Sequence, residues 1–231
     1  MNLPALWRRM RDEGAILLAF LALAALSLVF LKLASEMAEG ETLGFDRAIM
    51  QWMRDHAGGP AMRTTMLDIT ALGGTAVLTL VTVAVTGFLI VVRKAATAGF
   101  VAASVTGGAL LSFALKLVFS RPRPDLVEHL VYDDTRSFPS GHATNSAVVY
   151  LTLGMLLAST QERHAPRIYL ISVAILLTLA IGVSRVYLGV HWPSDVIAGW
   201  CAGAAWAGLC GVAGQWLQRR HRIEAPGEEA A

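Results

Sequence analysis

Charge is scarce in this sequence. Only 16% of its 231 residues are charged, whereas 55% are hydrophobic and the mean hydropathy is +0.55. An ordinary soluble domain carries about 25% charged residues, so this composition argues against a soluble protein and indicates a membrane protein. The formal net charge is only +2 and the basic residues are scattered, which excludes an extended nucleic-acid-binding surface.

Cysteine is almost absent, and the two that occur, Cys201 and Cys210, lie in one apolar stretch. On a helix, nine residues separate them by roughly 13 to 14 Å along the axis, well beyond the about 5.5–6 Å between the Cα atoms of a disulfide. We therefore expect free thiols packed among apolar neighbours. The sequence also lacks a carboxylate-rich or Cys/His pattern for a metal, so we expect no metal and no cofactor.

Long apolar runs are what the sequence has instead. Each is long enough to cross a hydrocarbon core of about 30 Å, which needs roughly 17–25 helical residues. A soluble bundle of this length would lack the polar sequence needed to cover such helices. We predict an all-α fold, a single membrane domain over residues 1–231, with six transmembrane helices at about 14–33, 69–92, 95–115, 143–161, 168–184 and 196–218.

The first run follows a basic start and could be mistaken for a secretory signal. It is longer than the usual apolar part of a signal peptide, and five similar runs follow, so we interpret it as a retained span. With the N-terminus in the cytoplasm, the 19 basic residues divide ten to nine between the two sides. Several on the second side belong to motifs that explain them as ligands, and the remainder predict cytoplasmic N- and C-termini.

The first outer connection, residues 34–68, contains an amphipathic pattern. Phe45, Ile49, Trp52 and Met53 recur at helical spacing, opposite charged residues. Two interpretations stay open with equal weight. The segment is either a helix lying at the membrane interface or a cap that packs over the bundle.

Three polar clusters stand at the ends of the predicted spans, all on the same side. The first, KLVFSRPRP, contains Lys116, Arg121 and Arg123 at the end of the third span. Its prolines stop the helix, and its cations are able to hold an anion such as phosphate. The alternative is that these side chains only extend from a helix end to the membrane surface.

The second cluster, SFPSGHATNSA, opens the fourth span. Pro139 and Ser140 favour a helix start, Gly141 allows close approach of the backbone, and the N–H groups of a helix N-terminus attract an anion that His142 would face. The alternative is an ordinary helix cap beside a chance histidine.

The third cluster, SRVYLGVHWPSDVIAG, connects the fifth and sixth spans. Arg185 is a further cation for a phosphate. His191 and Asp195 are four residues apart, so a helix that begins near Trp192 would bring the carboxylate to the imidazole Nδ1 and leave Nε2 free to attack. The alternative is a structural His–Asp hydrogen bond.

Together the clusters resemble the type 2 phosphatidic acid phosphatase superfamily. Its three-part signature, K-x-x-x-x-x-x-R-P, P-S-G-H and S-R-x-x-x-x-x-H-x-x-x-D, stands without a mismatch at Lys116–Pro124, Pro139–His142 and Ser184–Asp195. The resemblance implies a membrane lipid phosphatase that needs no metal. Its active site would lie at the extracytoplasmic ends of helices 3 to 6.

The resemblance also implies a role for each site residue. His191 would attack phosphorus and form a phosphohistidine, Asp195 would orient it, and His142 would protonate the leaving oxygen and then activate water. The groups that would hold the phosphate oxygens are Lys116, Arg123, Ser140, Gly141 and Arg185. We interpret the other polar residues around the signature as a solvated loop outside the site: Arg121, Asp125, Glu128, Asp133, Asp134 and Arg136.

The expected substrate is a membrane lipid of the undecaprenyl diphosphate, phosphatidylglycerol phosphate or phosphatidate class, at the outer face of an inner (plasma) membrane. No nucleic acid and no obligate protein partner is expected. A lipid phosphotransferase that uses the same intermediate is the first alternative. A lipid transporter is a remote one, because the spans lack the charges of a translocation path.

Overall fold

The computed structural model describes residues 3–126, 130, 136–220 and 222–223 of the chain. Over these residues the protein is all-α, as predicted, with no strand. Eight helices follow one another in the order α1 (Leu3–Glu39), α2 (Leu43–Asp55), α3 (Pro60–Ala71), α4 (Thr75–Val91), α5 (Ala95–Val118), α6 (Gly141–Ser159), α7 (His164–Tyr187) and α8 (Pro193–Arg219).

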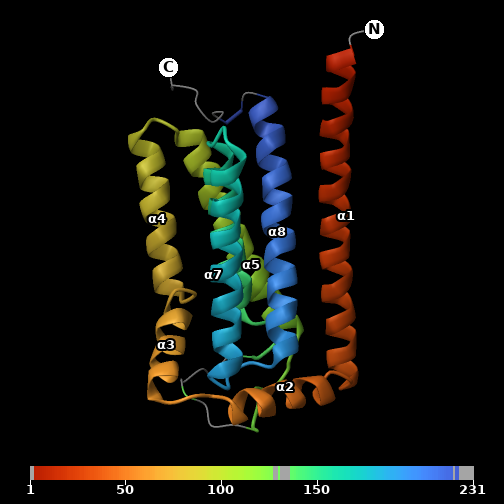
Figure 1. The fold of residues 1–231 in the computed structure, drawn as a ribbon, viewed down its shortest axis with the longest axis vertical. Helices are drawn as coiled ribbons and strands as arrows, with labels where there is room; N and C mark the ends of the chain where they lie inside the picture. Colours follow the sequence, from red (N-terminus) through yellow and green to blue (C-terminus); the bar gives the residue numbers. More distant parts are fainter. Residues whose placement is uncertain (1–2, 127–129, 131–135, 221, 224–231) are drawn as a thin grey trace.

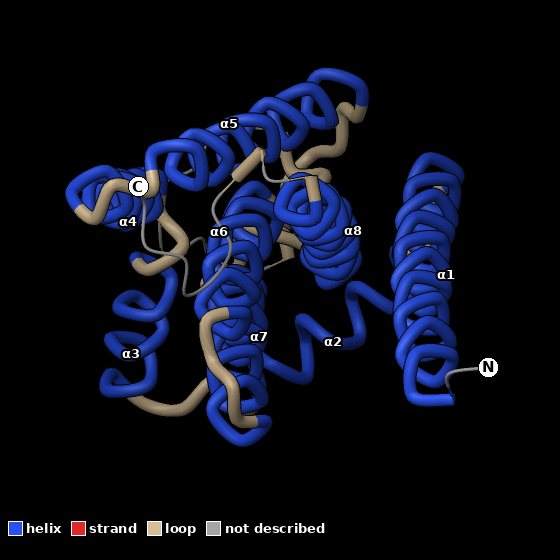
Figure 2. The backbone as a smooth tube through the Cα atoms, turned by 90° about the horizontal axis from the view of Figure 1, so that it is seen from above, coloured by secondary structure: helices blue, strands red, loops and turns tan. Residues whose placement is uncertain are grey.

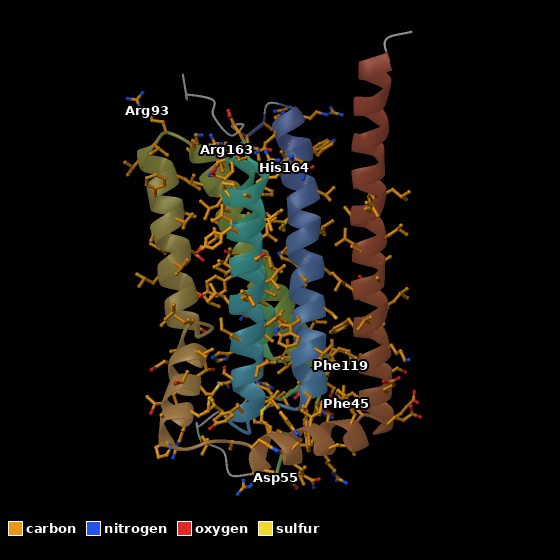
Figure 3. The ribbon with its side chains drawn as sticks, viewed as in Figure 1. Phe45, Asp55, Arg93, Phe119, Arg163 and His164 are labelled. Carbon is orange, nitrogen blue, oxygen red and sulfur yellow. The ribbon has the colours of Figure 1, made fainter. Side chains whose placement is uncertain are left out.

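The long helices run side by side, and the amphipathic α2 lies across one end of them (Figure 1). Seen from above, α1 stands at the edge of the bundle beside α8, and α6 lies among α5, α7 and α8 (Figure 2). The start of α1 and the last turn of α8 lie at the end opposite α2 (Figure 1). Arg93 and Arg163 also lie at that end (Figure 3).

Among the described residues, four helical segments are long and apolar enough to cross a membrane: Leu17–Glu39, Ala95–Val118, His164–Tyr187 and Pro193–Gln218. They cover four of the six predicted spans. Pro60–Ala71 and Thr75–Val91, which meet at a bend of 46°, give a fifth crossing if they are counted as one broken span. Membrane-spanning helices are therefore confirmed, whereas the number six stays a prediction.

The remaining predicted span, 143–161, coincides with α6, which is not among these segments. Polar residues fill its first turns, and two of them, Thr144 and Ser146, are fully buried and donate to backbone carbonyls of the preceding turn. The polar turns of α6 therefore face protein instead of lipid.

Two glycines on α8 allow it to lie directly against the start of α6. A Cβ added at Gly203 would come 2.4 Å from the Thr144 carbonyl oxygen, and one added at Gly199 would come 2.8 Å from the Ser140 carbonyl oxygen. Small residues at helix contacts permit this close approach. A hydrogen bond also joins the two helices. The Ser140 N–H donates to the Asp195 carbonyl oxygen at 3.0 Å, which connects the first turn of α8 to the start of α6.

The helix α2 caps the bundle with one face. Met50 is buried against Trp192, Val196 and Ala143, so the packing interpretation of the 34–68 segment is confirmed for this face. Phe45 and Trp52 on the same helix are exposed, and a role for them at the membrane interface stays a prediction. Cys201 and Cys210 are free and buried, as expected.

Candidate active site

Three stretches of chain meet at the end of the bundle that α2 covers. They are the end of α5 with the segment after it, the start of α6, and the connection between α7 and α8. Each contains one of the polar clusters found in the sequence. Contacts among them bring residues up to 74 positions apart in the sequence into direct hydrogen bonds.

His191 is the buried centre of this region, with a relative exposure of 1%. Its Nδ1 lies 3.5 Å from Asp195 Oδ2 and 3.4 Å from Ser137 Oγ. Its Nε2 lies 3.4 Å from Arg123 Nη1. The structure thus brings together the imidazole and the carboxylate that the sequence predicted as a pair, and places a cation next to the second ring nitrogen.

The pairing follows from the start of α8. Pro193 is the first residue of the helix, and the Asp195 carboxylate accepts the Trp192 backbone N–H at 3.0 Å, which caps it. A carboxylate is favourable in a first helical turn because the unpaired N–H groups there carry partial positive charge. The same carboxylate faces the imidazole four residues earlier.

Burial lowers the pKa of His191 to about 4, an effect that outweighs the opposing influence of Asp195. The imidazole is therefore neutral at neutral pH. Placing its one proton on Nδ1 satisfies the carboxylate, and the lone pair is then on Nε2, beside Arg123. A neutral, oriented imidazole of this kind is a competent nucleophile.

Arg121 is the largest departure from the sequence prediction. The interpretation of Arg121 as part of a solvated loop is wrong, because its side chain is only 6% exposed and lies between two carboxylates. One terminal nitrogen donates to Asp195 Oδ1 and the other to Asp46 Oδ2, each at 2.6 Å. Its guanidinium also lies over the Trp192 ring, 5.2 Å from the centroid.

Ser137 is a site residue that sequence reasoning missed. Its buried hydroxyl donates to Asp195 Oδ2, next to the imidazole. Its backbone N–H donates to the Arg121 carbonyl oxygen at 3.0 Å. It lies two residues before the P-S-G-H signature, and nothing in the local sequence distinguishes it from a loop serine.

The other polar residues around the signature were also predicted to be solvated. Arg136 is exposed, as expected, and it also donates to the Leu117 carbonyl oxygen at the end of α5, at 2.7 Å. Asp125 is exposed, as expected. Glu128, Asp133 and Asp134 lie outside the described residues.

Lys116 and Gly141 adjoin each other in the structure. The lysine is half-buried at the end of α5 and its Nζ donates to the Arg136 carbonyl oxygen at 3.1 Å. A Cβ on Gly141 would lie 3.4 Å from Lys116 Cε and 3.6 Å from Nζ. The ammonium group therefore lies over the first turn of α6, whose free N–H groups also attract anions. Ser140, fully buried, caps that turn by accepting the Ala143 N–H at 3.5 Å.

The other predicted site residues come from α7, the segment after α5 and the first turn of α6. Arg185 is 3% exposed and its Nη1 donates to Thr70 Oγ1 at 3.2 Å. Arg123 donates to the Val190 carbonyl oxygen, which fixes it beside His191. His142, the second residue of α6, is half-buried, and its Cδ2 lies 3.4 Å from where a Cβ on Gly73 would be.

The histidine, cysteine, aspartate and glutamate side chains within the described ranges form no group of three or more that could hold a metal ion. The cations of the region are those of arginine and lysine. These side chains can hold phosphate oxygens directly through charge-assisted hydrogen bonds.

Comparison with known proteins identifies one family. Its model, the PAP2 superfamily, matches residues 97–219, more than half of the chain and all three polar clusters. Among curated proteins, phosphatidylglycerophosphatase B of Bacillus subtilis is 39% identical over 97 residues, which are 41% of this chain and 46% of that protein. Undecaprenyl-diphosphatase of Sulfolobus acidocaldarius is 41% identical over 68 residues, 29% of each protein. The chain thus matches less than half the length of these two relatives.

A solved structure matches over a longer range. The crystal structure described as the first transmembrane PAP2 type phosphatidylglycerolphosphate phosphatase from Bacillus subtilis superimposes with a TM-score of 0.78 at 29% sequence identity. The superposition covers 85% of this chain and 98% of that one. The similarity therefore extends to helices outside the three polar clusters.

Proposed function

The chain belongs to the PAP2 superfamily, and on that premise we propose that it is an integral membrane phosphatase acting on a lipid phosphate or diphosphate through a phosphohistidine. The observation that carries the proposal is the state of His191, a buried neutral imidazole held at Nδ1 by Asp195, with Arg123 beside Nε2. The relatives described above are named as lipid phosphatases.

In the first step the phosphoryl group lies among the fixed cations, and His191 Nε2 attacks phosphorus. The new P–N bond forms as the bond from phosphorus to the leaving oxygen breaks. His142 donates a proton to that oxygen. The Nδ1 proton stays on the ring, and Asp195 accepts its hydrogen bond and stabilises the positive charge that develops on the ring. The lipid alcohol, or the lipid monophosphate when the substrate is a diphosphate, then departs.

In the second step water replaces the lipid. His142, now neutral, takes a proton from the water as its oxygen attacks phosphorus, and the P–N bond breaks. Inorganic phosphate leaves and His191 returns to the neutral state. The proton that His142 gave up in the first step is thus recovered in the second, so the enzyme is unchanged.

Fixed positive charge is the main catalytic contribution. The groups that would hold the non-bridging oxygens are Lys116, Arg123 and Arg185 together with Ser140 and Gly141 at the start of α6. In a buried site these groups need little reorganisation as charge moves toward the leaving and attacking oxygens, which is how phosphoryl transfer is accelerated.

We place the site at the outer face of a plasma membrane that all six predicted spans cross, α6 included. Arg93 and Arg163 lie at the end opposite α2 (Figure 3). An excess of basic residues marks cytoplasmic ends. A site at the membrane surface suits a substrate whose tails stay in the bilayer, and undecaprenyl diphosphate, phosphatidylglycerol phosphate and phosphatidate are the candidate classes.

The experiment is phosphate release by the purified, detergent-solubilised protein in excess EDTA. The panel contains isoprenyl diphosphates, phosphatidylglycerol phosphate and phosphatidate, and the control is a folded His191→Ala variant. We expect EDTA to leave the rate of phosphate release unchanged. The rate of the His191→Ala variant should be lower than that of the unaltered chain by at least about three orders of magnitude, the scale of losing a covalent nucleophile. Equal release by both proteins would overturn the nucleophile, and no release across the panel would overturn hydrolysis.

A further inference from the structure

Asp46 of α2 is a buried carboxylate that the reaction above does not use. Its relative exposure is 0%, although α2 is an otherwise amphipathic surface helix. A buried charge is strongly unfavourable unless it is paired and hydrogen-bonded. Within the described part of the chain, the groups that pair with Asp46 belong to the candidate active site, which suggests a role beyond holding α2 in place.

Three hydrogen bonds hold the Asp46 carboxylate. Oδ1 accepts the Ser194 backbone N–H at 2.8 Å, and Oδ2 accepts the Ser194 hydroxyl at 2.7 Å and Arg121 Nη2 at 2.6 Å. Ser194 is the second residue of α8 and directly precedes Asp195. Asp46 therefore fixes both the backbone next to Asp195 and the cation that binds it.

Arg121 continues the connection to the imidazole. Its other terminal nitrogen, Nη1, donates to Asp195 Oδ1 at 2.6 Å and to Ser194 Oγ at 2.7 Å. The second oxygen of Asp195 faces His191 Nδ1 at 3.5 Å. A continuous series of contacts thus runs from α2 through Arg121 and Asp195 to the nucleophile.

The charges explain why two carboxylates are needed. Asp195 must keep its negative charge to stabilise the imidazole as the ring becomes positive. With Asp195 as its only carboxylate partner, the Arg121 cation would cancel much of that charge. Asp46 supplies a second negative charge on the far side of the guanidinium, so the three groups together carry a net charge of minus one that faces His191.

We propose that Asp46 is a positioning residue for the phosphatase reaction, acting through Arg121 and Ser194 on Asp195, an inference that rests on the proposed function. It touches neither the substrate nor the reacting nitrogen. Its removal should therefore affect the chemical step while leaving the phosphate-binding groups intact.

The test compares Asp46→Asn with Asp55→Asn, which removes a carboxylate from the exposed end of the same helix. For Asp46→Asn we expect kcat to fall roughly 10- to 100-fold, the scale seen when partners that orient active-site ligands are removed. KM and the inhibition constant of inorganic phosphate should change by less than about threefold. Asp55→Asn should behave like the unaltered chain in all three quantities.

A loss of fold must be separated from a loss of positioning. Size-exclusion chromatography and thermal unfolding in detergent establish the folded fraction of each variant, and kcat is expressed per folded protein. If Asp46→Asn does not fold, Ser194→Ala decides, because it removes the hydroxyl shared by Asp46 and Arg121 and keeps both charges. We expect Ser194→Ala to lower kcat severalfold at unchanged KM.

Failure of this inference differs from failure of the proposed function. The unaltered chain and His191→Ala are measured in the same assay, with the substrate of the panel that is hydrolysed fastest. If these two differ as expected but Asp46→Asn, or Ser194→Ala in its place, keeps full kcat per folded protein, Asp46 only fastens α2. If the unaltered chain and His191→Ala do not differ, the proposed function itself is overturned.

Discussion

At the scale of single residues, the protonation state of His191 is the property on which the proposed chemistry depends. Burial lowers its pKa to about 4, from an ordinary value of about 6.5. Between these two pH values the unfolded chain binds a proton at this position and the native chain does not. His191 therefore destabilises the fold as the pH falls through that window, and remains a neutral nucleophile throughout it.

This state predicts a histidine that titrates unusually late. In detergent-solubilised protein with labelled histidines, the ring resonances of His191, identified by their loss in His191→Ala, should stay those of a neutral imidazole from pH 8 down to about pH 5. A midpoint near the ordinary value of about 6.5 would contradict the burial argument.

Single residues also mark how far the sequence alone could lead. The proximity of His191 and Asp195 could be predicted because their spacing and the helix start that controls it are both local in the chain. The partner of Arg121 could not be found in this way, since Asp46 lies 75 residues earlier. A charged residue looks solvated in a sequence unless its partner is known, and the burial of Arg121 appears only in three dimensions.

At the scale of helices, the fold keeps the site together by direct contact between α6 and α8. Gly203 is the most constrained point of this contact, because an added Cβ would lie 2.4 Å from a backbone oxygen and 2.6 Å from the Ala147 Cβ. Backbone and a short side chain have no room to move aside, so the helices would have to separate.

We therefore expect Gly203→Ala to destabilise the protein by about 1–3 kcal/mol, the usual result of overpacking. Separation of the helices should also weaken the bond between Ser140 N–H and the Asp195 carbonyl oxygen, and lower activity. The matched control is Gly87→Ala on α4, where no atom lies within 4 Å of the added Cβ. In thermal unfolding experiments in detergent, the control should unfold at the same temperature as the unaltered chain, and Gly203→Ala at a lower one. Equal unfolding temperatures of the two variants would refute the contact argument.

Helix prediction succeeded where apolar length is the main signal and was incomplete where a helix faces protein. The predicted span 69–92 becomes α3 and α4, which meet at a bend next to Gly73, where a Cβ would lie 2.4 Å from Ile181 Cγ2. In α6 the buried polar residues lower the hydropathy of a helix at the centre of the bundle. Hydropathy measures compatibility with lipid, so it underestimates a helix that other helices surround.

At the scale of the whole molecule, the two ends of the bundle differ in chemistry. One end holds the site beneath α2, and the other holds the start of α1 with Arg93 and Arg163. If basic residues mark the cytoplasmic end, the site faces outward, and a lipid substrate reaches it from the outer leaflet. This orientation is a proposal that a labelling experiment can decide.

Asp55 and Arg163 are exposed and stand at opposite ends of the protein (Figure 3). We expect a cysteine at Asp55 to react with a membrane-impermeant maleimide on intact cells, and a cysteine at Arg163 to react only after the membrane is permeabilised. The native Cys201 and Cys210 are buried and should give little background, which the unaltered chain measures. The opposite labelling pattern would place the site in the cytoplasm, and labelling of both positions on intact cells would mean that the chain lacks a single orientation.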